Sequence, residues 1–517
     1  MKLDTESLSK KRVVLFNPEP KGFKGAEIQI PVPPFALLAI AGPLWEAGYD
    51  IKIIDAVVEE NWQGKITKYA DGAICFGVTS MTGYQIKGGV EMSKLVKERY
   101  PDVRVIWGGY HPSIMPEQTA ANKYIDIVVR GQGERTMLEV VQHLKKHLSL
   151  DGILGITYKN DGKIVINPDR FFEDINNFPS FQFHLIDVER YIIDSLRSQT
   201  IGYMSSQGCP YQCKFCAELK VTKRRWSGLK AERVLNDIEY LVKNHGINGL
   251  HIYDSNFFIN KKRVEEICEG LLARNIDIAW GNVNLRADQI TYADEKLLKL
   301  LKQTHCEWFL TGAESGRQEI LDFITKGTKV EDTIRLKEIF SRYDFKPLFG
   351  FVLGFPYKNL INVSLKEDFD AIIDTVRRIQ TIDRKNEFLL WLYTPYPGTP
   401  IYNLAIQNGV REPKNLEEWS RFTLNFSNIP WLPKKYEKIA DQLNYYIFPY
   451  TSSHFNTIWE IKYQGHFKAL KRVFHRVLQV MARFRLKYRF LCFPIEYEIL
   501  SFRRRWKARK INAEYQS

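Results

Sequence analysis

Three cysteines lie close together in the sequence and are the residues best suited to chemistry in this chain. They are Cys209, Cys213 and Cys216, in the stretch Gly-Cys-Pro-Tyr-Gln-Cys-Lys-Phe-Cys-Ala from 208 to 217. Three thiolates at this spacing can hold one 4Fe-4S cube and leave its fourth iron without a protein ligand. A ferredoxin cluster and a structural zinc site each take four ligands, and no fourth cysteine or histidine lies near these three in the sequence. Because an open iron can bind a substrate, the spacing indicates a reactive cluster rather than a structural zinc knuckle.

The pattern C-x3-C-x2-C, with Phe215 just before its last cysteine, resembles the signature loop of the radical S-adenosylmethionine (radical SAM) enzymes. The resemblance implies that the three cysteines hold a 4Fe-4S cluster and that the open iron chelates the amino and carboxylate groups of SAM. An electron from an external donor, such as flavodoxin or ferredoxin, then splits SAM through the cluster to a 5'-deoxyadenosyl radical. We expect Phe215 beside these cofactors, and the sequence identifies no catalytic residue beyond the cluster ligands.

The first 150 residues alternate short β-branched runs with helical patterns. This alternation predicts an α/β domain with a Rossmann-like parallel sheet of five strands. Ligands of such sheets bind beyond the carboxyl ends of the strands. The expected strands are 12–16, 51–55, 73–77, 103–107 and 125–129, and the expected helices are 35–47, 84–99 and 134–148.

Three segments that contain glycine follow successive predicted strands, at 78–83, 108–112 and 130–134. In this order they resemble the cobalamin-binding domain that precedes the cluster loop in one large radical SAM subclass. The resemblance covers residues 10–150, and Asp55 and the segment 32–34 also fit it. It implies cobalamin contacts from Ser80, Met81, Thr82, Gly83, Gly108, Gly109, His111, Gly131, Gly133 and Glu134.

The motif D-x-H-x-x-G, with which some cobalamin enzymes ligate cobalt through histidine, is absent from the chain. Gly109 stands two residues before His111, where that motif has aspartate. We therefore expect cobalamin to be held without a histidine ligand from this motif. For His111 itself, a structural role in the loop and a contact with cobalamin both stay open.

Residues 151–194 are expected to form an irregular connector, after which a second series of βα units begins. The expected strands are 200–205, 249–253, 277–283, 308–312, 348–353 and 387–393. Six such units predict a partial (β/α)6 TIM-like barrel over 195–410, with its chemistry at the carboxyl ends of the strands. The strand ends resemble those of the radical SAM family, and the resemblance implies SAM contacts from Asp254, Arg286, Glu314, Ser315 and Leu353. Asp254 would contact the amino group, the next three the carboxylate and ribose, and Leu353 the adenine.

Composition is typical of a globular protein from a reducing compartment. The 517 residues are 44% hydrophobic, and the four cysteines outside the cluster loop show no pairing pattern. The sequence shows neither a signal peptide nor an apolar run of about 18 residues. We expect a cytoplasmic protein, placed peripherally at the inner membrane surface if its C-terminal region binds lipid.

The positive charge is concentrated in the C-terminal region 411–517, which is expected to be mainly helical. Of the net charge of +14, residues 461–517 contribute +12, from fifteen Lys or Arg and three acids. An apolar stripe at helical spacing consists of Phe467, Leu470, Phe474, Val477, Met481, Phe484, Tyr488 and Leu491. Lys and Arg occupy many positions between them, which is the pattern of an interfacial membrane helix. A helix packed on the barrel with a solvated basic face is the other interpretation, and nothing resembles an RNA-binding appendage.

Together the two resemblances imply a cobalamin-dependent radical SAM methyltransferase that acts on an unactivated carbon of a small-molecule or lipid-like substrate. Such a carbon has no lone pair with which to take a methyl group from SAM directly. The resemblance implies two uses of SAM, one to methylate the corrinoid and one to form the radical that removes a substrate hydrogen. The alternative among enzymes is an oxidative cyclase or a rearrangement enzyme with the same cofactors. The alternative of another class is a non-catalytic corrinoid and iron-sulfur binding protein.

Overall fold

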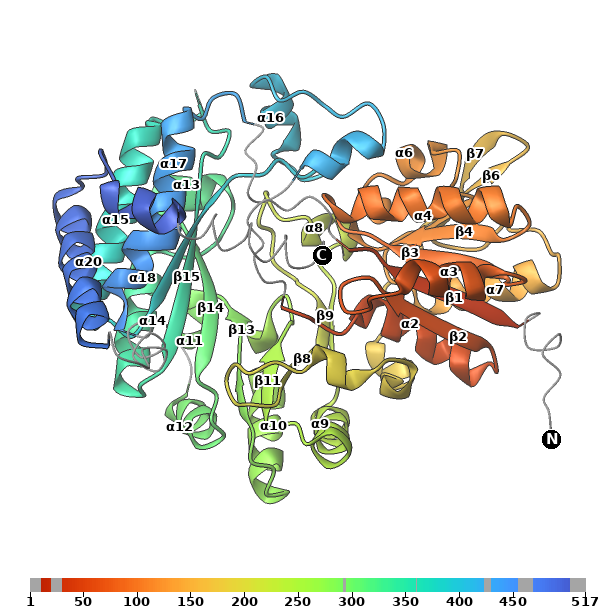
Figure 1. The fold of residues 1–517 in the computed structure, drawn as a ribbon, viewed down its shortest axis with the longest axis horizontal. Helices are drawn as coiled ribbons and strands as arrows, with labels where there is room; N and C mark the ends of the chain where they lie inside the picture. The colour runs from red at the N-terminus through yellow and green to blue at the C-terminus, as the bar shows by residue number, and fades with distance from the viewer. Residues whose placement is uncertain are drawn as a thin grey trace. The chain divides into compact units, whose positions relative to one another are not determined.

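The structure is a computed structural model that describes residues 11–19, 30–291, 294–358, 360–422, 429–453 and 468–502. It divides into two compact units, each of which is considered by itself (Figure 1). The first unit runs to Trp280 and includes the later segment Thr394–Asn428. The second unit contains Gly281–Tyr393 and the chain from Ile429 onward. The predicted mixed α/β class with a parallel sheet and a helical C-terminal region is confirmed.

A seven-stranded sheet in the first unit has the order β2-β1-β3-β4-β5-β6-β7. Its first five strands are parallel, as predicted, and their bounds differ from the expected ones by a few residues. The strands are β1 (Arg12–Asn17), β2 (Asp50–Asp55), β3 (Cys75–Thr79), β4 (Arg104–Gly108), β5 (Ile127–Val129), β6 (Ile156–Asn160) and β7 (Lys163–Ile166). The helices of this part are α2 (Phe35–Glu46), α3 (Trp62–Ala70), α4 (Gln85–Arg99), α5 (Tyr110–Ile114), α6 (Pro116–Ala121) and α7 (Glu134–Lys145).

Helices cover both faces of this sheet. Helices α2 and α7 pack together on one face, where Val13 and Leu15 of β1 join the core. On the other face Phe16 stacks on Trp62 of α3, with 5.5 Å between ring centroids. Because β1 is covered on both sides, its residues from 13 to 16 are apolar at every position rather than alternating. The parallel arrangement brings the ends of β3, β4 and β5 to one edge, which is where the predicted cobalamin loops begin.

The connector expected to be irregular over 151–194 instead supplies two more strands. Strand β6 pairs antiparallel with β5 and with β7, so the sheet is extended beyond the predicted boundary at 150. The turn between β6 and β7 contains Asp161 (φ 46) and Gly162 (φ 78). Asp-Gly is a favoured pair for a tight hairpin because both residues tolerate positive φ. The Asp161-Gly162 pair is therefore a hairpin signal in a region that was expected to be irregular.

The remainder of the first unit carries the cysteine loop. A three-stranded sheet has the order β12-β11-β8, and β9 pairs antiparallel with β10 beside it. Strand β8 runs parallel to β11. The strands are β8 (Thr200–Tyr203), β9 (Ser206–Gly208), β10 (Trp226–Gly228), β11 (Gly249–Ile252) and β12 (Ala279–Gly281). The helices are α8 (Glu218–Val221), α9 (Ala231–His245), α10 (Lys261–Ala273) and, in the returning segment, α16 (Tyr402–Gln407) and the short η5 (Glu417–Arg421).

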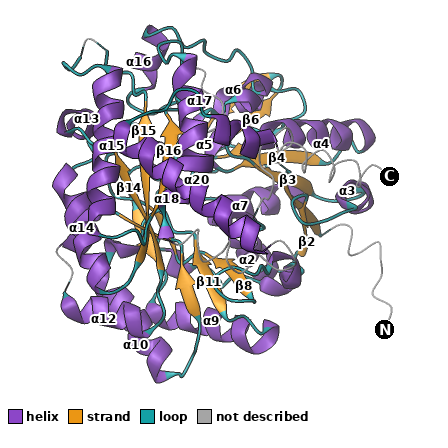
Figure 2. Cartoon of the chain, turned by 60° about the vertical axis from the view of Figure 1, so that its left-hand side comes forward, coloured by secondary structure: helices purple, strands orange, loops and turns teal. Residues whose placement is uncertain are grey.

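The second unit is built on a parallel sheet with the order β13-β14-β15-β16. Its strands are β13 (Val283–Leu285), β14 (Trp308–Glu314), β15 (Lys346–Leu353) and β16 (Glu387–Leu392). Its helices, purple in Figure 2, are α11 (Ala287–Thr291), α12 (Glu295–Gln303), α13 (Gln318–Phe323), α14 (Val330–Arg342), α15 (Leu365–Ile382), α17 (Lys434–Gln442), η6 (Leu443–Ile447), α18 (Phe448–Thr451) and α20 (Lys468–Tyr488).

The predicted strand 277–283 is interrupted in the structure. Asn282 has a left-handed backbone with φ 57, and the two short strands on either side of it belong to different sheets. Closure of a six-unit barrel therefore stays a prediction. Within the described residues, no helix is both long enough and apolar enough to cross a membrane.

Candidate active site

The cysteine loop connects β9 to α8 and is held at its start by the short β9–β10 pair. Gly208 begins the loop with φ +86, and a Cβ at this position would lie 2.2 Å from the Arg225 carbonyl oxygen. Only glycine fits there, because the backbone conformation and the close approach both exclude a side chain. Cys209, Cys213 and Cys216 are not joined in disulfides and are of intermediate exposure, and the Cys216 amide donates to the Cys213 carbonyl at 3.0 Å.

The loop fits the implied cluster by the kind and placement of its ligands. Burial is the largest of the influences that raise the pKa of Cys216 to about 12, and the nearby Cys213 and Cys209 contribute to this rise. The other two thiols are therefore close enough to affect the Cys216 thiol electrostatically. No three His, Cys, Asp or Glu side chains of the described residues are grouped so as to hold a single metal ion. A cube places a different iron at each cysteine, so its three ligands need to surround a larger object than one ion.

The first two predicted cobalamin loops are joined to each other at the sheet edge. Gly109 has φ +98, and a Cβ there would lie 2.8 Å from the Ser80 carbonyl oxygen. The amide of His111 donates to that same carbonyl at 3.1 Å, and the Thr82 hydroxyl lies 3.0 Å from the His111 Nδ1. Met81, at the tip of the first loop, is 59% exposed. The edge therefore presents backbone and small polar groups, which suit a corrinoid held by its amide side chains.

His111 is completely buried and packs against Trp419 at 5.5 Å between ring centroids. Its Nε2 is buried without a hydrogen-bond partner. Burial lowers the pKa of His111 to about 3, so its imidazole is neutral at physiological pH. The contacts with Thr82 and Trp419 give His111 a structural role in the loop, and its contact with cobalamin stays a prediction.

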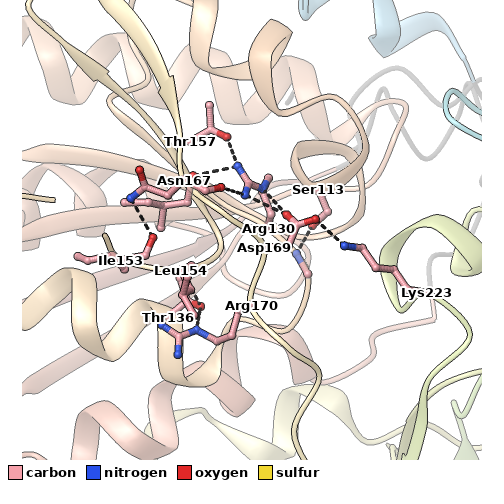
Figure 3. A network of polar contacts seen from close by, with 12 residues as sticks. Ser113, Arg130, Thr136, Ile153, Leu154, Thr157, Asn167, Asp169, Arg170 and Lys223 are labelled. Carbon is pink, nitrogen blue, oxygen red and sulfur yellow. Dashed lines mark hydrogen bonds and ion pairs between the residues drawn. The ribbon is translucent and has the colours of Figure 1, made fainter. Parts of the chain in front are cut away.

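The third loop, which contains Gly131 and Gly133, is fixed by the buried Arg130 (Figure 3). The Arg130 guanidinium donates to the carbonyls of Ile156 and Asn167 and pairs with Asp169 at 2.9 Å. Asp169 also pairs with Lys223, which lies just beyond α8. Arg130 thus connects the third loop to the hairpin strands and, through Asp169, to the segment that follows the cysteines.

Glu134 joins the third loop to the strand that leads into the cysteine loop. It is buried, and its Oε1 accepts a hydrogen bond of 2.8 Å from the Gln207 side chain in β9. Burial is the largest influence on this carboxyl and raises its pKa. Gln132 lies 3.3 Å from the same Gln207. These contacts place the third predicted cobalamin loop beside the strand that leads into the cysteine loop.

A second link between these regions was not anticipated from the sequence. Tyr110 of the second loop donates its hydroxyl hydrogen to Glu218, the first residue of α8. Ser255, just after β11, donates to the same carboxylate oxygen at 3.0 Å. The other oxygen, Oε1, is buried without a hydrogen-bond partner. The second loop, the cysteine loop and the end of β11 therefore meet at the Glu218 carboxylate.

Asp254, the predicted contact of the SAM amino group, is buried at the end of β11. Its Oδ1 accepts from the Ser205 amide at 2.6 Å, and its Oδ2 accepts from the hydroxyls of Ser205 and Ser206. Burial raises the pKa of Asp254, while nearby Arg263 lowers it. These bonds fix the end of β8 against the end of β11. A direct contact of Asp254 with SAM stays a prediction.

The other predicted SAM contacts lie in the second unit, at the ends of its strands. Arg286 follows β13, and its guanidinium forms a fork with the Asp288 carboxylate at 3.1 Å. Glu314, at the end of β14, has a left-handed backbone (φ 61) and pairs with the Lys326 ammonium at 2.7 Å. Because Arg286 also donates to the Lys326 carbonyl, both predicted contacts converge on one residue. A non-glycine residue at positive φ carries strain, which is common at functional sites.

Ser315 and Leu353 complete the predicted set in the second unit. The Ser315 hydroxyl donates to Asp368 at 2.8 Å, and the Leu353 side chain is fully buried at the end of β15. Phe215 lies between the last two cysteines in the first unit and is of intermediate exposure. The structure thus groups the cluster and cobalamin candidates in one unit and four SAM candidates in the other.

Comparison with known families finds both halves of the predicted organisation. A family model described as the B12 binding domain matches residues 24–141, and one described as the radical SAM superfamily matches residues 203–368. Both matched ranges fall within the regions where the sequence suggested these resemblances.

Relatives with curated names extend over most of the chain. A protein of Pyrococcus horikoshii named "Uncharacterized methyltransferase PH0819" is 31% identical over 396 residues, which is 76% of this chain and 82% of that protein. An anaerobic magnesium-protoporphyrin IX monomethyl ester cyclase of Synechocystis sp. is 25% identical over 77% of this chain and 78% of its own length.

A solved structure has a similar fold. The radical S-adenosylmethionine methyltransferase TsrM of Kitasatospora setae, with cobalamin and a 4Fe-4S cluster bound, is 19% identical and has a TM-score of 0.64. The similarity covers 92% of this chain and 99% of that one. At this identity the similarity concerns the fold.

Proposed function

Because the chain belongs to the cobalamin-dependent radical SAM family, we propose that it methylates an unactivated carbon of a small-molecule or lipid-like substrate. The observation that carries the proposal is the junction at Glu218, two residues beyond Cys216, where Tyr110 of a predicted cobalamin loop and Ser255 after β11 donate to the same carboxylate oxygen. An enzyme that uses a corrinoid and a SAM-derived radical on one substrate needs the two sites to be adjacent. When bound, cobalamin supplies a transferable methyl group, and SAM at the cluster supplies the radical that removes a hydrogen atom.

The residues of the chain have positioning tasks in this proposal. Cys209, Cys213 and Cys216 ligate the cluster, and Gly208 gives their loop its direction. Thr82, His111 and Arg130 order the loops that present backbone groups to the corrinoid. These hydrogen bonds, which are charge-assisted at Arg130, hold the loops in a fixed geometry. In a radical reaction, a fixed geometry restricts which substrate carbon can react.

The SAM contacts proposed for the second unit suit the ligand by charge type. The Arg286 guanidinium matches the SAM carboxylate, since a planar fork binds carboxylates in a bidentate manner. Glu314 and Ser315 offer acceptors for ribose hydroxyls, and the apolar Leu353 suits adenine. Arg286 and Glu314 are already engaged with Asp288 and Lys326, so SAM binding would exchange at least one of these partners. A low-potential donor such as flavodoxin or ferredoxin would deliver the electron.

An oxidative cyclase is the second candidate function, because a named cyclase is 25% identical to this chain over 77% of its length. The two functions differ in what happens to the substrate. A methyltransferase adds a carbon, whereas a cyclase removes hydrogen and adds none.

The test uses the full-length protein, reconstituted anaerobically with iron, sulfide and cobalamin, and supplied with methyl-deuterated SAM and a reductant. We expect about four irons per chain, formation of 5'-deoxyadenosine, and transfer of the deuterated methyl group to one compound in a lipid or metabolite extract. The variant in which all three loop cysteines are Ala should lose iron and 5'-deoxyadenosine, while Cys492→Ala, an exposed cysteine outside the loop, should retain both. Formation of 5'-deoxyadenosine with loss of substrate hydrogen and no label transfer would favour the cyclase.

A further inference from the structure

Helix α20 packs on the second unit through a face different from the apolar stripe noted in the sequence. Its inward residues are the buried His475, Leu478, Ala482, Arg485 and Leu486. The ring of His475 lies 5.0 Å from that of Tyr450 in α18, and the Tyr446 hydroxyl donates to the Leu478 carbonyl at 3.1 Å. Figure 2 shows α20 crossing over α15 and α18. The helix is therefore anchored by contacts that do not need its stripe.

The stripe itself faces outward. Val477 is 48% exposed, Phe484 53% and Tyr488 60%, and Val473 and Val480, on the same side, are 60% and 64% exposed. Residues three and four positions apart share one side of a helix, so these side chains form a continuous apolar row along α20. Isolated exposed apolar residues are ordinary, but a contiguous row along a whole helix marks an interaction site. Phe467, at the start of the stripe, lies outside the described residues.

The segment after α20 also exposes large apolar side chains. Arg485 forms a buried fork with Glu496, and it donates to the carbonyls of Phe490, Cys492 and Phe493. These bonds turn the chain back toward the helix. They leave Phe493 78% and Ile495 68% exposed. The backbone of this segment is thus held in place while its large apolar side chains stay exposed to solvent. Within the described residues, nothing in the fold requires this exposure, so we interpret it as part of a binding surface.

Basic residues follow one border of the apolar row. Arg472, Arg476 and Lys487 are exposed, and helical spacing places them together between the apolar row and the buried face. Arg489, in contrast, pairs with Asp370 and Asp374 of α15 and belongs to the anchor. Long basic side chains beside an apolar row can extend to lipid headgroups while the row enters the acyl boundary.

We propose that this surface of α20, made of Val473, Val477, Val480, Phe484, Tyr488, Phe493 and Ile495 with Arg472, Arg476 and Lys487, docks the enzyme on an anionic lipid bilayer. An interfacial helix with both apolar and basic sides supplies the two signals that stable but reversible membrane binding requires. The charge of the region supports a lipid partner, because residues 461–517 contain fifteen Lys or Arg and only three acids. This inference is independent of the proposed reaction.

Charge argues against a second copy of the chain as the occupant. Two such surfaces brought together would place their basic borders near each other, which costs free energy without an acidic partner. Nucleic acid would satisfy the charge but not the apolar row. An anionic bilayer satisfies both.

The experiment is co-sedimentation of the full-length, cofactor-loaded protein with phosphatidylcholine vesicles and with vesicles that also contain phosphatidylglycerol, at low and high salt. We expect binding to the anionic vesicles, weakened by salt, and little binding to the neutral ones. The double variant Val477→Ser, Phe484→Ser should bind the anionic vesicles at least about tenfold more weakly, since it removes apolar area from the row. The matched control is Phe171→Ser, which changes the most exposed phenylalanine of the first unit (83%) and should bind as the parent does.

The charge contribution has its own pair of variants. Replacing Arg472, Arg476 and Lys487 by Gln should weaken binding to anionic vesicles by about fivefold for each charge removed. The control replaces the exposed Lys243, Lys262 and Lys299 by Gln, which removes the same charge elsewhere and should have a much smaller effect. Both surface variants should keep the parent's thermal unfolding and cluster absorbance.

Three results would overturn the proposal. They are equal sedimentation with both kinds of vesicle, unchanged binding of both surface variants, and a concentration-dependent dimer in sedimentation velocity that only the apolar variant dissociates. The last result would assign the surface to a second copy of the chain.

Discussion

At the scale of single residues, Glu218 links the second predicted cobalamin loop to the segment that follows the cysteines. Its carboxylate accepts from Tyr110 and Ser255, and burial together with Glu218 raises the pKa of the Tyr110 hydroxyl well above its usual value. The hydroxyl therefore remains a donor at any physiological pH. A donor fixed in this way gives the second cobalamin loop one defined position relative to the cysteine loop.

The first prediction concerns this bond. Tyr110→Phe or Glu218→Gln should weaken cobalamin binding by about tenfold, because a hydrogen bond to a charged acceptor contributes about 1.5 to 3 kcal/mol, part of which orders the loop. Cobalamin dissociation constants, measured by absorbance, provide the readout.

If both residues act only through this one hydrogen bond, the double variant should lose little more affinity than either single variant. The control is Tyr402→Phe, which removes a tyrosine hydroxyl 3.3 Å from Glu412 in the same unit and should leave cobalamin affinity unchanged. Additive losses in the double variant would contradict the link.

Asp368 in the second unit leads to a prediction on pH. Burial is the main reason that its pKa rises from 3.8 to about 7. Hydrogen bonds from Ser315 and Tyr357 act in the opposite direction and lower the pKa. The folded protein therefore keeps this proton over a range in which the unfolded chain has lost it. Stability from this group is largest below the unfolded pKa and falls as pH rises toward the folded pKa.

Asp368→Asn removes that titration and keeps the shape of the side chain. Relative to the parent, the variant should gain stability as pH rises from about 4 to 7, by at most about 4 kcal/mol over the window. Thermal unfolding of both proteins at several pH values in this range measures the difference. Parallel stability profiles for the two proteins would show that Asp368 does not titrate as its burial indicates.

At the scale of elements, the cysteine loop depends on the geometry of the β9–β10 pair. Gly208→Ala should abolish cluster loading, because the added Cβ would lie 2.2 Å from a backbone oxygen that has no freedom to move away. The control is Gly246→Ala at the end of α9, where φ is +63 but nothing lies within 4 Å of the added atom. That change should cost only about 1 kcal/mol of backbone strain and leave iron content near the parent's. Iron per chain and far-UV circular dichroism separate the two cases, and equal loss of iron in both would show that the steric argument is wrong.

Helices and strands with a clear pattern of apolar residues were predictable from the sequence. Elements whose position depends on a single turn were not. The five parallel strands and helices α2, α4 and α7 lie close to the expected ranges. The β6–β7 hairpin was missed because its strands are short and its edge strand is mostly exposed. The break at Asn282 had only a short signal, the pair Gly281-Asn282, in which asparagine tolerates the positive φ that the structure shows.

The candidate site was predictable in its motifs but not in its contacts. Gly109 and Gly208 could be noticed as glycines, but only the structure shows that each faces a carbonyl that would exclude a side chain. Tyr110 lies inside the second predicted cobalamin loop, and Glu218 lies two residues beyond the last cysteine. No local rule pairs residues so distant in sequence. The part of the predicted stripe that lies on α20 with described side chains, from Phe474 to Tyr488, is exposed. Its outward direction depends on which neighbours the helix meets.

At the scale of the whole molecule, the first unit brings together the predicted cobalamin loops and the cysteine loop, which lie far apart in the sequence. Two contacts join the predicted cobalamin loops directly to the segment around the cysteines: Tyr110 with Glu218, and Glu134 with Gln207. A third connection is indirect, because Asp169 pairs with both Arg130 of the third loop and Lys223. Such contacts couple the segments, because a loop that becomes fixed also restricts the groups bonded to it. Cobalamin binding should therefore reach beyond the loops that touch it.

The last prediction tests this connection by hydrogen exchange of the full chain with and without cobalamin. Cobalamin should slow exchange in segments 78–83, 108–112 and 130–134, which are the predicted contacts, and also in 209–224, which contains the cysteines. At a cobalamin concentration about 100 times its dissociation constant, the stabilisation available to the bound state is about 2.7 kcal/mol, enough to slow local opening up to about a hundredfold. Helix α12 in the second unit is the internal control and should exchange at the same rate in both samples. With Glu218→Gln the protection of 209–224 should decrease while that of 78–83 persists, since the substitution weakens the connection without touching the first loop. Protection confined to the three cobalamin loops in the parent protein would mean that the contacts at Glu218, Gln207 and Lys223 hold the fold together without coupling the two cofactor sites.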